Sequence, residues 1–392
     1  MLELALRGSR AYWIWMGGLA AVMVLGFGFY LDQLENGLMV TGQSRDVSWG
    51  FYTAQMTFLV GVAAGGVMLV MPYYLHDYKV FGRITILGEF LAVAAISMCL
   101  TYLLVHLGQP ARALNIFLYP TPWSMLFWDG NVLTAYLILN IIIGWKVLEA
   151  EHNGAAPPGW VKPLVYLSIP MAFSIHTVTA FLYCGLTGRG FWLTAVLAPR
   201  FLASAFASGP ALLILLAMVI RRLTPFDAGE RAVQSLAVIA AYGLAANLFF
   251  MVCEVFVVFY SAIPSHMAHF KYLYAGLHGK SGLVPWMWTS LFLMVTAACI
   301  LAVPALRKNR ALLPCACVCL FVGTWIDKGM GMISGGFVPS PLHHVTEYAP
   351  SLHELAISAG ITAMGLFILT LLYKMVLSVK IRSENGCDLS RA

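Results

Sequence analysis

Residues 233–263 read VQSLAVIAAYGLAANLFFMVCEVFVVFYSAI, a run of apolar side chains that carries a single acid, Glu254. A helix needs roughly 20 residues, at about 1.5 Å each, to cross about 30 Å of hydrocarbon. This stretch is therefore long enough to cross a membrane as one helix. Runs of the same character recur along the whole chain.

The same criterion predicts about ten spans, near residues 11–31, 51–75, 84–105, 129–148, 163–184, 201–220, 233–263, 284–304, 311–333 and 353–377. Of the 392 residues, 60% are hydrophobic and 10% charged, whereas soluble domains carry about a quarter charged residues. We therefore predict an all-α, polytopic membrane protein with a single integral membrane domain over residues 1–392. The first span has no small-x-small cleavage motif after it, so we expect it to stay in the protein.

A faint internal repeat suggests how the helices are grouped. Pro122-Trp123 precedes the fourth span and Pro285-Trp286 precedes the eighth, four spans later and in the same direction. This spacing is compatible with two four-helix bundle units, residues 49–184 and 201–333, with flanking helices at 11–31 and 353–377. Coincidence in a tryptophan-rich chain explains the repeat equally well.

Lysine and arginine residues fall unevenly on the two sides of these spans. Sixteen lie on the side of the N-terminus, six lie on the other side, among them Arg200 in an expected loop over 185–200, and Lys328 lies within a span. Because positively charged loops stay cytoplasmic, we predict an inner (cytoplasmic) membrane protein with both termini in the cytoplasm. The charges form no basic stripe, which argues against nucleic acid as a partner.

The cysteines and histidines do not form the patterns that bind haem or metal. Of eight cysteines, Cys315, Cys317 and Cys319 are the closest together, and successive members point about 200° apart on a helix. C-x-x-C does not occur, and His176 alone among ten histidines lies clearly within a span. We therefore expect neither haem nor an iron–sulfur cluster in this chain, and no metal site.

Ionisable groups inside hydrocarbon cost several kcal/mol unless they are paired or face a cavity, so each one is a site candidate. The predicted helix directions place several polar residues at one depth, beneath the non-cytoplasmic surface. They are Gln55, Gln109, Arg112, Asp129, Asn131, His176, Thr179, Tyr183, Glu254, Asp327, Lys328, His353 and Glu354. Their shared depth favours a functional site there.

Several of these residues also have a purely structural interpretation. Lys328 and Glu254 would make a buried ion pair that fixes helix order. His176 would be a hydrogen-bonded core histidine, and Asp129 a helix N-cap. Arg112 would be an interfacial anchor, and Gln55 a cross-link between helices.

Three further polar residues lie deeper in the spans. Glu89, Asn140 and Asn247 either line a proton path between the cytoplasmic side and the site or cross-link neighbouring helices.

Three stretches resemble the NrfD/PsrC family of quinone-interacting membrane subunits. They are WGFYTAQMTFLVGVAAGG at 49–66, LGQPARALN at 107–115 and PTPWSMLFW at 120–128. Within that family, LMVTGQSRDVSW at 38–49 is similar to the integral-membrane subunits of sulfate reducers, both the DsrP type and that of the high-molecular-weight cytochrome complex. One departure is His106, where family members commonly have an acid before Leu-Gly-x-Pro.

The resemblance implies an all-helical subunit that binds menaquinone or menaquinol near the periplasmic side. It also implies a periplasmic ferredoxin-like iron–sulfur subunit as the electron partner, with further redox subunits such as a multihaem cytochrome c. The complex would be a menaquinol oxidoreductase of anaerobic respiration. The chain by itself would carry no catalytic redox centre.

Quinol oxidation releases two electrons and two protons, so the site needs polar partners for two oxygens beside an apolar slot. We predict that His176 binds a quinone oxygen and that Glu254 and Asp327 relay protons. Lys328 would balance their charge. The residues Gln55, His106, Arg112, Asp129 and Tyr183 would form the rest of the pocket. The alternatives are a membrane anchor without quinone chemistry and a secondary transporter.

Overall fold

The computed structural model describes residues 2–389, with side chains described for residues 3–382. Ten of its helical segments are long and apolar enough to cross a membrane, which confirms the predicted number. They are α2 with η1 (Arg10–Asn36, Gly37–Val40), α3 with α4 (Phe51–Gly65, Val67–Leu75), α5 (Thr85–His106), α7 (Met125–His152), α8 (Val161–Cys184), α9 (Leu197–Leu223), α10 (Glu230–Tyr260), α12 (Val284–Ala302), α14 with η4 and α15 (Leu312–Ile326, Asp327–Gly331, Met332–Phe337) and α16 (Leu352–Leu389).

Short helices fill the connections between these spans. They are α1 (Leu2–Leu6), η2 (Lys79–Phe81), η3 (Pro110–Arg112), α6 (Asn115–Leu118), α11 (Pro264–Tyr274) and α13 (Pro304–Arg307). Apart from one isolated bridge between Leu277 and Lys280, the regular structure of residues 2–389 is helical, so the all-α prediction is confirmed.

The boundaries of two spans differ from the prediction in a way that bears on the site. Helix α9 begins at Leu197 rather than at 201, so Arg200 lies inside a span and the predicted loop position is wrong. Helix α7 begins at Met125 after Ser124, so Asp129 lies in its second turn and the interpretation of Asp129 as an N-cap is also wrong. In both cases the helix begins before the charged residue. The charge is tolerated inside the span because the side chain has a buried partner.

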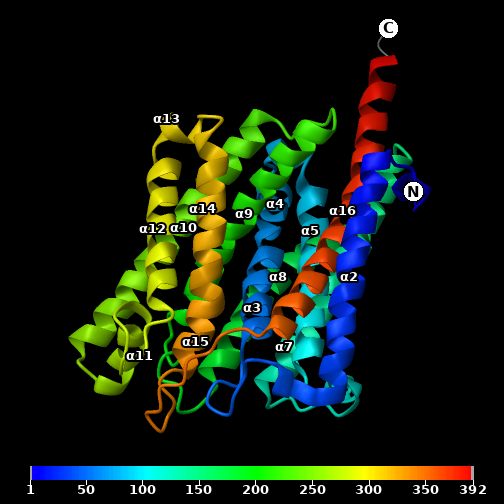
Figure 1. Ribbon diagram of the computed structural model, residues 1–392. Coiled ribbons are helices and arrows are strands. Elements are labelled where there is room, and N and C mark those ends of the chain that lie inside the picture. Colours follow the sequence, from blue (N-terminus) through cyan, green and yellow to red (C-terminus); the bar gives the residue numbers. More distant parts are fainter. Residues whose placement is uncertain (1, 390–392) are drawn as a thin grey trace.

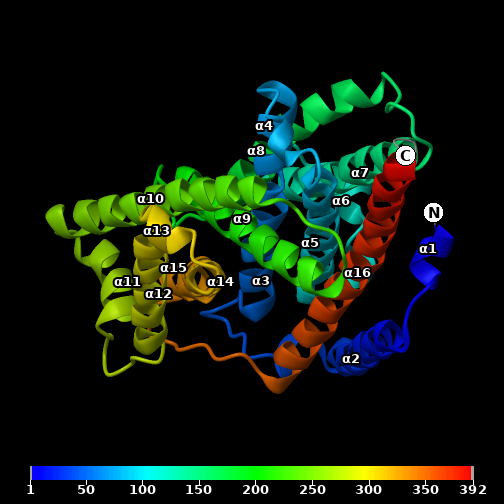
Figure 2. The same cartoon turned by 90° about the horizontal axis from the view of Figure 1, so that it is seen from above.

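The long helices run roughly side by side, and both ends of the chain lie at the same end of the bundle (Figure 1). Seen from that end, α2 and α16 lie on one flank, while α10, α11 and α12 lie on the other (Figure 2). Helix α3 packs on α5 and α8, and α7 packs on both of these helices. Helix α9 packs on α10 and α14, and α12 packs on both of these helices.

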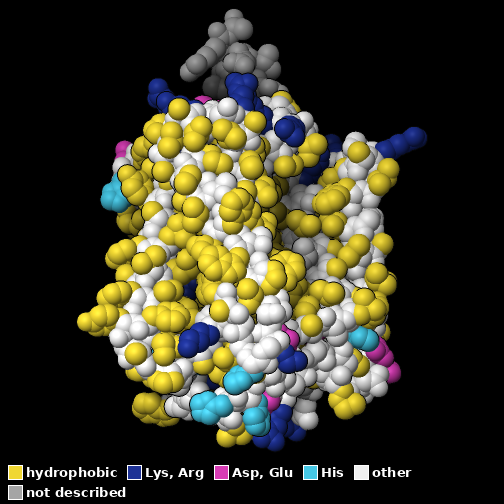
Figure 3. Space-filling view, turned by 60° about the vertical axis from the view of Figure 1, so that its left-hand side comes forward, with side chains coloured by type: hydrophobic (Ala, Val, Ile, Leu, Met, Phe, Trp, Pro, Cys, Tyr) yellow, Lys and Arg dark blue, Asp and Glu magenta, His cyan; other side chains and the backbone are white. Residues whose placement is uncertain are grey.

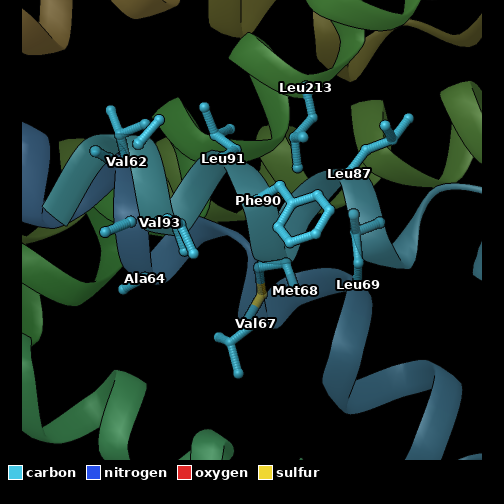
Figure 4. Close-up of a cluster of buried hydrophobic side chains, with 14 of the residues drawn as sticks. Val62, Ala64, Val67, Met68, Leu69, Leu87, Phe90, Leu91, Val93 and Leu213 are labelled. Carbon is cyan, nitrogen blue, oxygen red and sulfur yellow. The ribbon is translucent and has the colours of Figure 1, made fainter. Parts of the chain in front are cut away.

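An apolar core lies where α3, α4, α5 and α9 meet. Side chains from all four segments interdigitate there, among them Val62, Leu69, Phe90 and Leu213 (Figure 4). Each of these four is at most 5% exposed. Because every span is apolar, close packing is needed to give this helix order its specificity.

Helices α3 and α9 approach each other most closely at a pair of glycines. A Cβ atom placed on Gly65 would overlap the Cα of Gly209, and a Cβ on Gly209 would overlap the Cα of Gly65 in the same way. Small residues at such crossings allow helix backbones to touch within a membrane. The helices α3, α5, α7 and α8 are therefore joined to α9, α10, α12 and α14 at a backbone-to-backbone contact.

Substitution of Gly65 by valine is expected to separate α3 from α9, because the obstacle is backbone and cannot rotate away. We expect Gly65→Val to lower the free energy of unfolding by about 1–3 kcal/mol, measured as the shift of the unfolding midpoint in detergent. Gly28→Val in α2 is the matched control, since a Cβ there meets nothing within 4 Å. An unchanged midpoint for Gly65→Val would contradict the close crossing.

Candidate functional site

An ionic cluster joins three helices in the half of the bundle opposite the termini. Arg200 of α9 donates from Nη1 to Glu254 of α10, and from Nη2 to both carboxylate oxygens of Asp327 at 2.7 Å. The three side chains are 11%, 7% and 5% exposed. One guanidinium therefore holds two carboxylates inside the bundle, where an unpaired charge would cost several kcal/mol.

Lys328 continues the cluster toward α8. Its ammonium lies 3.3 Å from Nε2 of His176 and donates to the carbonyl oxygen of Phe201 at 3.3 Å. It also lies 4.5 Å from the centre of the Phe201 ring, within range of a cation–π interaction. Lys328 thus meets two helices, while its neighbour Asp327 meets the guanidinium on α9.

The backbone around these two residues is shaped to bring them in. Asp327 and Lys328 begin η4, a π-helical turn, and such turns are frequently found at functional sites. A Cβ on Gly61 of α3 would lie 3.1 Å from the Lys328 ammonium and 3.7 Å from Nε2 of His176. Any larger residue at Gly61 would crowd the contact between the lysine and the histidine.

Two further residues of α8 form polar contacts with neighbouring helices. Thr179, one turn after His176, donates to Asp129 of α7 at 2.6 Å. Tyr183, a further turn along, hydrogen-bonds Thr57 of α3. One face of α8 therefore connects Asp129 with His176 and, through Lys328 and Asp327, with the ionic cluster on α9 and α10.

Several of these buried groups have an atom with no hydrogen-bond partner in the described part of the chain. The atoms on predicted site residues are Nδ1 of His106, Oδ2 of Asp129, Nδ1 of His176, Oε2 of Glu89 and Oδ1 of Asn247. Buried polar atoms are normally satisfied, so unpartnered ones point to water, an ion or a ligand. Four of the five belong to α5, α7 and α8, namely those of Glu89, His106, Asp129 and His176.

Cavities of very different size lie near these residues. The space lined by Arg200, Asn247, Asp327 and Lys328 has a volume of about 10 Å³, about enough for one water molecule. A cavity of about 570 Å³ lies between α5, η3, α6 and α7, and its lining includes Arg112 and Gly130. The ring of a quinone fits the larger cavity and not the smaller one.

Gln55 lies at a third cavity, of about 470 Å³, whose walls come from α3, α5, α9, α14 and α16. Its side-chain oxygen accepts a hydrogen bond from the Trp325 indole at 3.0 Å. The predicted cross-link between helices is therefore present, and it joins α3 to α14. The walls of this cavity are otherwise almost entirely apolar.

The structure brings together most of the predicted site residues but pairs them differently. The interpretation that Lys328 pairs with Glu254 is wrong, because Arg200 holds Glu254 and His176 contacts Lys328. Arg112 is exposed and lines the 570 Å³ cavity. His176 lines neither of the two larger cavities.

The deeper polar residues do not share one environment. Asn247 lines the small cavity beside the ionic cluster and donates to the sulfur of Met294 at 3.7 Å. Asn140 donates to the carbonyl oxygen of Tyr136 in its own helix. Glu89 is 4% exposed on α5. The proton path through these three residues stays a prediction.

Arg200 is the site residue that sequence reasoning missed. It follows Pro199, and proline is tolerated in the first turn of a helix because the backbone N–H groups there have no intrahelical partner. A helix start at Leu197 was therefore compatible with the sequence, and it would have placed Arg200 within the span.

An aromatic layer covers the site on the side opposite the termini. Trp49 stacks on Trp192 at 5.9 Å between ring centres, and Tyr183 and Phe337 pack edge-on against both rings. Tyr348 closes the layer by donating to Glu354 at 2.6 Å and accepting from the backbone N–H of Phe51 at 2.7 Å. Burial next to the Glu354 carboxylate raises the pKa of Tyr348, so this hydroxyl stays protonated.

The fold and the site together define a polytopic helical membrane protein that has an ionic network buried among its spans. The profile of the polysulphide reductase NrfD family matches residues 39–339. The chain therefore belongs to the NrfD family.

Individual relatives are similar over most of the chain. A candidate membrane subunit of a dimethyl sulfoxide reductase from Halobacterium salinarum is 26% identical, with 90% of this chain and 88% of that protein covered. The menaquinone reductase integral membrane subunit of Nitratidesulfovibrio vulgaris is 25% identical over 93% of this chain and 91% of its own length. The Hdr-like menaquinol oxidoreductase integral membrane subunit of Archaeoglobus fulgidus is 25% identical over 57% of this chain and 54% of its own length.

Removal of the guanidinium is expected to destabilise the bundle, because Glu254 and Asp327 would lose their shared partner. We expect Arg200→Met to lower the free energy of unfolding by about 3–5 kcal/mol, measured as the loss of folded protein in a thermal series in detergent. Lys146→Met is the control. It breaks an ion pair with Glu149 that is 36% and 41% exposed, and such pairs contribute about 0–1 kcal/mol. Equal effects of the two substitutions would contradict the role of Arg200.

Proposed function

We propose that the chain is the quinone-interacting membrane subunit of a respiratory electron-transfer complex. It would exchange electrons and protons with menaquinol and menaquinone. Two relatives carry menaquinol or menaquinone in their names. A third is a selenate reductase subunit of Mesobacillus selenatarsenatis, 21% identical over 91% of this chain and 92% of its own length. The common element is a subunit of a reductase or oxidoreductase.

The proposed quinone site is the 570 Å³ cavity between α5, η3, α6 and α7. Its volume lies in the range of about 300–1,000 Å³ typical of small-molecule sites. The leucines of α5 and Phe117 and Phe127 provide apolar walls. The polar lining residues are Arg112, Asn115, Thr121, Ser124 and Thr134. This combination suits a flat apolar ring that carries two oxygens.

The observation that carries the proposal is the position of Asp129. It directly precedes Gly130, which lines the cavity, and one of its carboxylate oxygens is buried without a partner in the described part of the chain. His106, at the end of α5, directly precedes Leu107 of the same cavity wall and also has an unpartnered ring nitrogen. Two titratable groups with unpartnered atoms are therefore sequence neighbours of residues that line one ring-sized space, although neither lines it directly.

Menaquinol, when bound, supplies two electrons and two protons. In the proposed route Asp129 accepts a proton and is oriented by the Thr179 hydroxyl. The proton then passes to His176, one turn before Thr179 on α8. Lys328 contacts His176 and is the sequence neighbour of Asp327, so it connects the histidine to the ionic cluster. Glu254 and Asp327 act as relay acids whose charge Arg200 and Lys328 balance. Tyr183 supports the α8 face, and Gln55 fixes α3 against α14.

The electrons leave to a partner subunit that docks on the face opposite the termini. This face carries the long loops and the aromatic layer, and the quinone cavity lies beneath it. The partner we propose is a periplasmic ferredoxin-like iron–sulfur subunit, followed by further redox subunits such as a multihaem cytochrome c. The excess of lysine and arginine on the side of the termini supports a cytoplasmic location for both of them in the inner membrane.

Substitution of Asp129 tests the proton acceptor directly. Asp129→Asn keeps the size of the side chain and a partner for Thr179, but it removes the group that takes the proton. We expect quinol-dependent electron transfer through the assembled complex to fall on the order of 10²-fold, with the other subunits still co-purifying. The measurement is the turnover of a soluble menaquinol analogue.

Glu149→Gln is the matched control for Asp129→Asn, since it is an acid-to-amide change at the other end of α7. Full activity is expected for this variant. If the Asp129→Asn complex is as active as the natural one, and quinone-site inhibitors do not lower the activity of either, an anchor without quinone chemistry is favoured. Solute uptake into vesicles by the chain without any redox partner would favour a transporter.

Substitution of His176 tests the next step of the route. We expect His176→Gln to slow quinol oxidation on the order of 10²-fold while leaving the occupancy of bound quinone in the purified complex unchanged. The reason is that His176 borders the route and not the cavity. Loss of bound quinone together with activity would instead place His176 in contact with the ring, and loss of complex assembly would make it a structural residue.

A further inference from the structure

A cavity of about 510 Å³ lies on the face of the bundle that carries the termini, far from the proposed quinone site. It is enclosed by the end of α9, the connection that follows, the start of α10, and the α13–α14 turn. Figure 2 looks onto this face and shows α9, α10, α13 and α14 next to one another. The proposed function does not use this cavity.

The cavity has two zones of different polarity. Its deeper wall comes from apolar residues of the membrane spans, among them Leu215, Met218, Val233 and Leu313. Its rim lies at the ends of the same helices and is formed by charged side chains. An apolar slot that opens beneath a charged rim matches the two-part structure of a phospholipid.

The charge of the rim is predominantly positive. Arg221, Arg222, Lys308 and Arg310 line it, against the two acids Asp227 and Glu230. Arg221 lies 3.7 Å from Asp227 and is partly neutralised. Glu230 accepts from Gln234 at 3.2 Å, in the first turn of α10.

The other three cations of the rim have no acidic partner among the residues that the structure describes. Within the described part of the chain, Arg222, Lys308 and Arg310 form no ion pair, and all three are exposed. In the view of Figure 3, lysine and arginine side chains are present at this end of the molecule and also at the opposite end, where most of the visible histidines gather. Basic pockets between membrane helices are known to hold anionic head groups.

We infer that this cavity binds an anionic phospholipid, with its phosphate on Arg222, Lys308 and Arg310 and an acyl chain along α9, α10 and α14. The chemistry that recognises the ligand is a phosphodiester joined to a long apolar chain. A free phosphate ion would use the rim alone and leave the apolar wall uncovered. A lipid covers both zones, and it reaches the cavity from the membrane.

The inference is tested by lipid binding to the full chain with the triple variant Arg222→Gln, Lys308→Gln and Arg310→Gln. The protein is reconstituted in phosphatidylcholine nanodiscs and titrated with phosphatidylglycerol, and retained lipid is counted by native mass spectrometry. We expect the triple variant to bind phosphatidylglycerol at least about tenfold more weakly than the natural chain, because it removes the positive charges that attract the phosphate.

The matched control removes the same charge from the same face outside the cavity, as Arg7→Gln, Arg10→Gln and Lys162→Gln. It is expected to bind like the natural chain, and an equal loss would show that general surface charge accounts for binding and would overturn the inference. Unchanged binding by the cavity variant would also overturn it. Inorganic phosphate that competes as well as phosphatidylglycerol would show that the rim takes a free anion and not a lipid.

Discussion

The contact of Arg200 with two carboxylates is the interaction on which the inner structure of this protein depends. Leucines and valines on the spans pack nearly as well against lipid as against each other, so apolar surface alone does not fix the order or rotation of helices in a membrane. A guanidinium held by Glu254 on one side and Asp327 on the other admits one rotation each of α9, α10 and α14. Through Lys328 the same constraint reaches His176 on α8.

The polar network and the apolar core thus have separate tasks. The core between α3, α5 and α9 brings backbones together, down to the contact of Gly65 with Gly209. The ionic network of Arg200, Glu254, Asp327 and Lys328 lies on the side opposite the termini. The aromatic layer of Trp49, Trp192 and Phe337 covers that side, so that the charged groups are shielded from water as well as from lipid.

The number of spans was predictable because apolar length is a local property that needs no knowledge of neighbours. Residues such as Glu254 and His176 were predictable as site candidates for the same reason, since each stands out within its own span. Their partners were not, because pairing depends on which helices are adjacent and how each is rotated. Asp129 is an example of a residue whose partner could not be predicted. Its position looked like a helix start, whereas the helix begins at Met125 and the carboxylate turns inward to Thr179.

The peripheral pair α2 and α16 has a consequence for how the chain is made. Helix α2 packs mainly on α16, with Gly26 against Gly360 at their closest point, and few of its side chains are buried elsewhere. During synthesis α2 emerges from the ribosome before α3 to α15, and α16 emerges after them. Helix α2 is therefore surrounded by lipid while eight further spans are made, and it gains its main packing partner only when α16 follows.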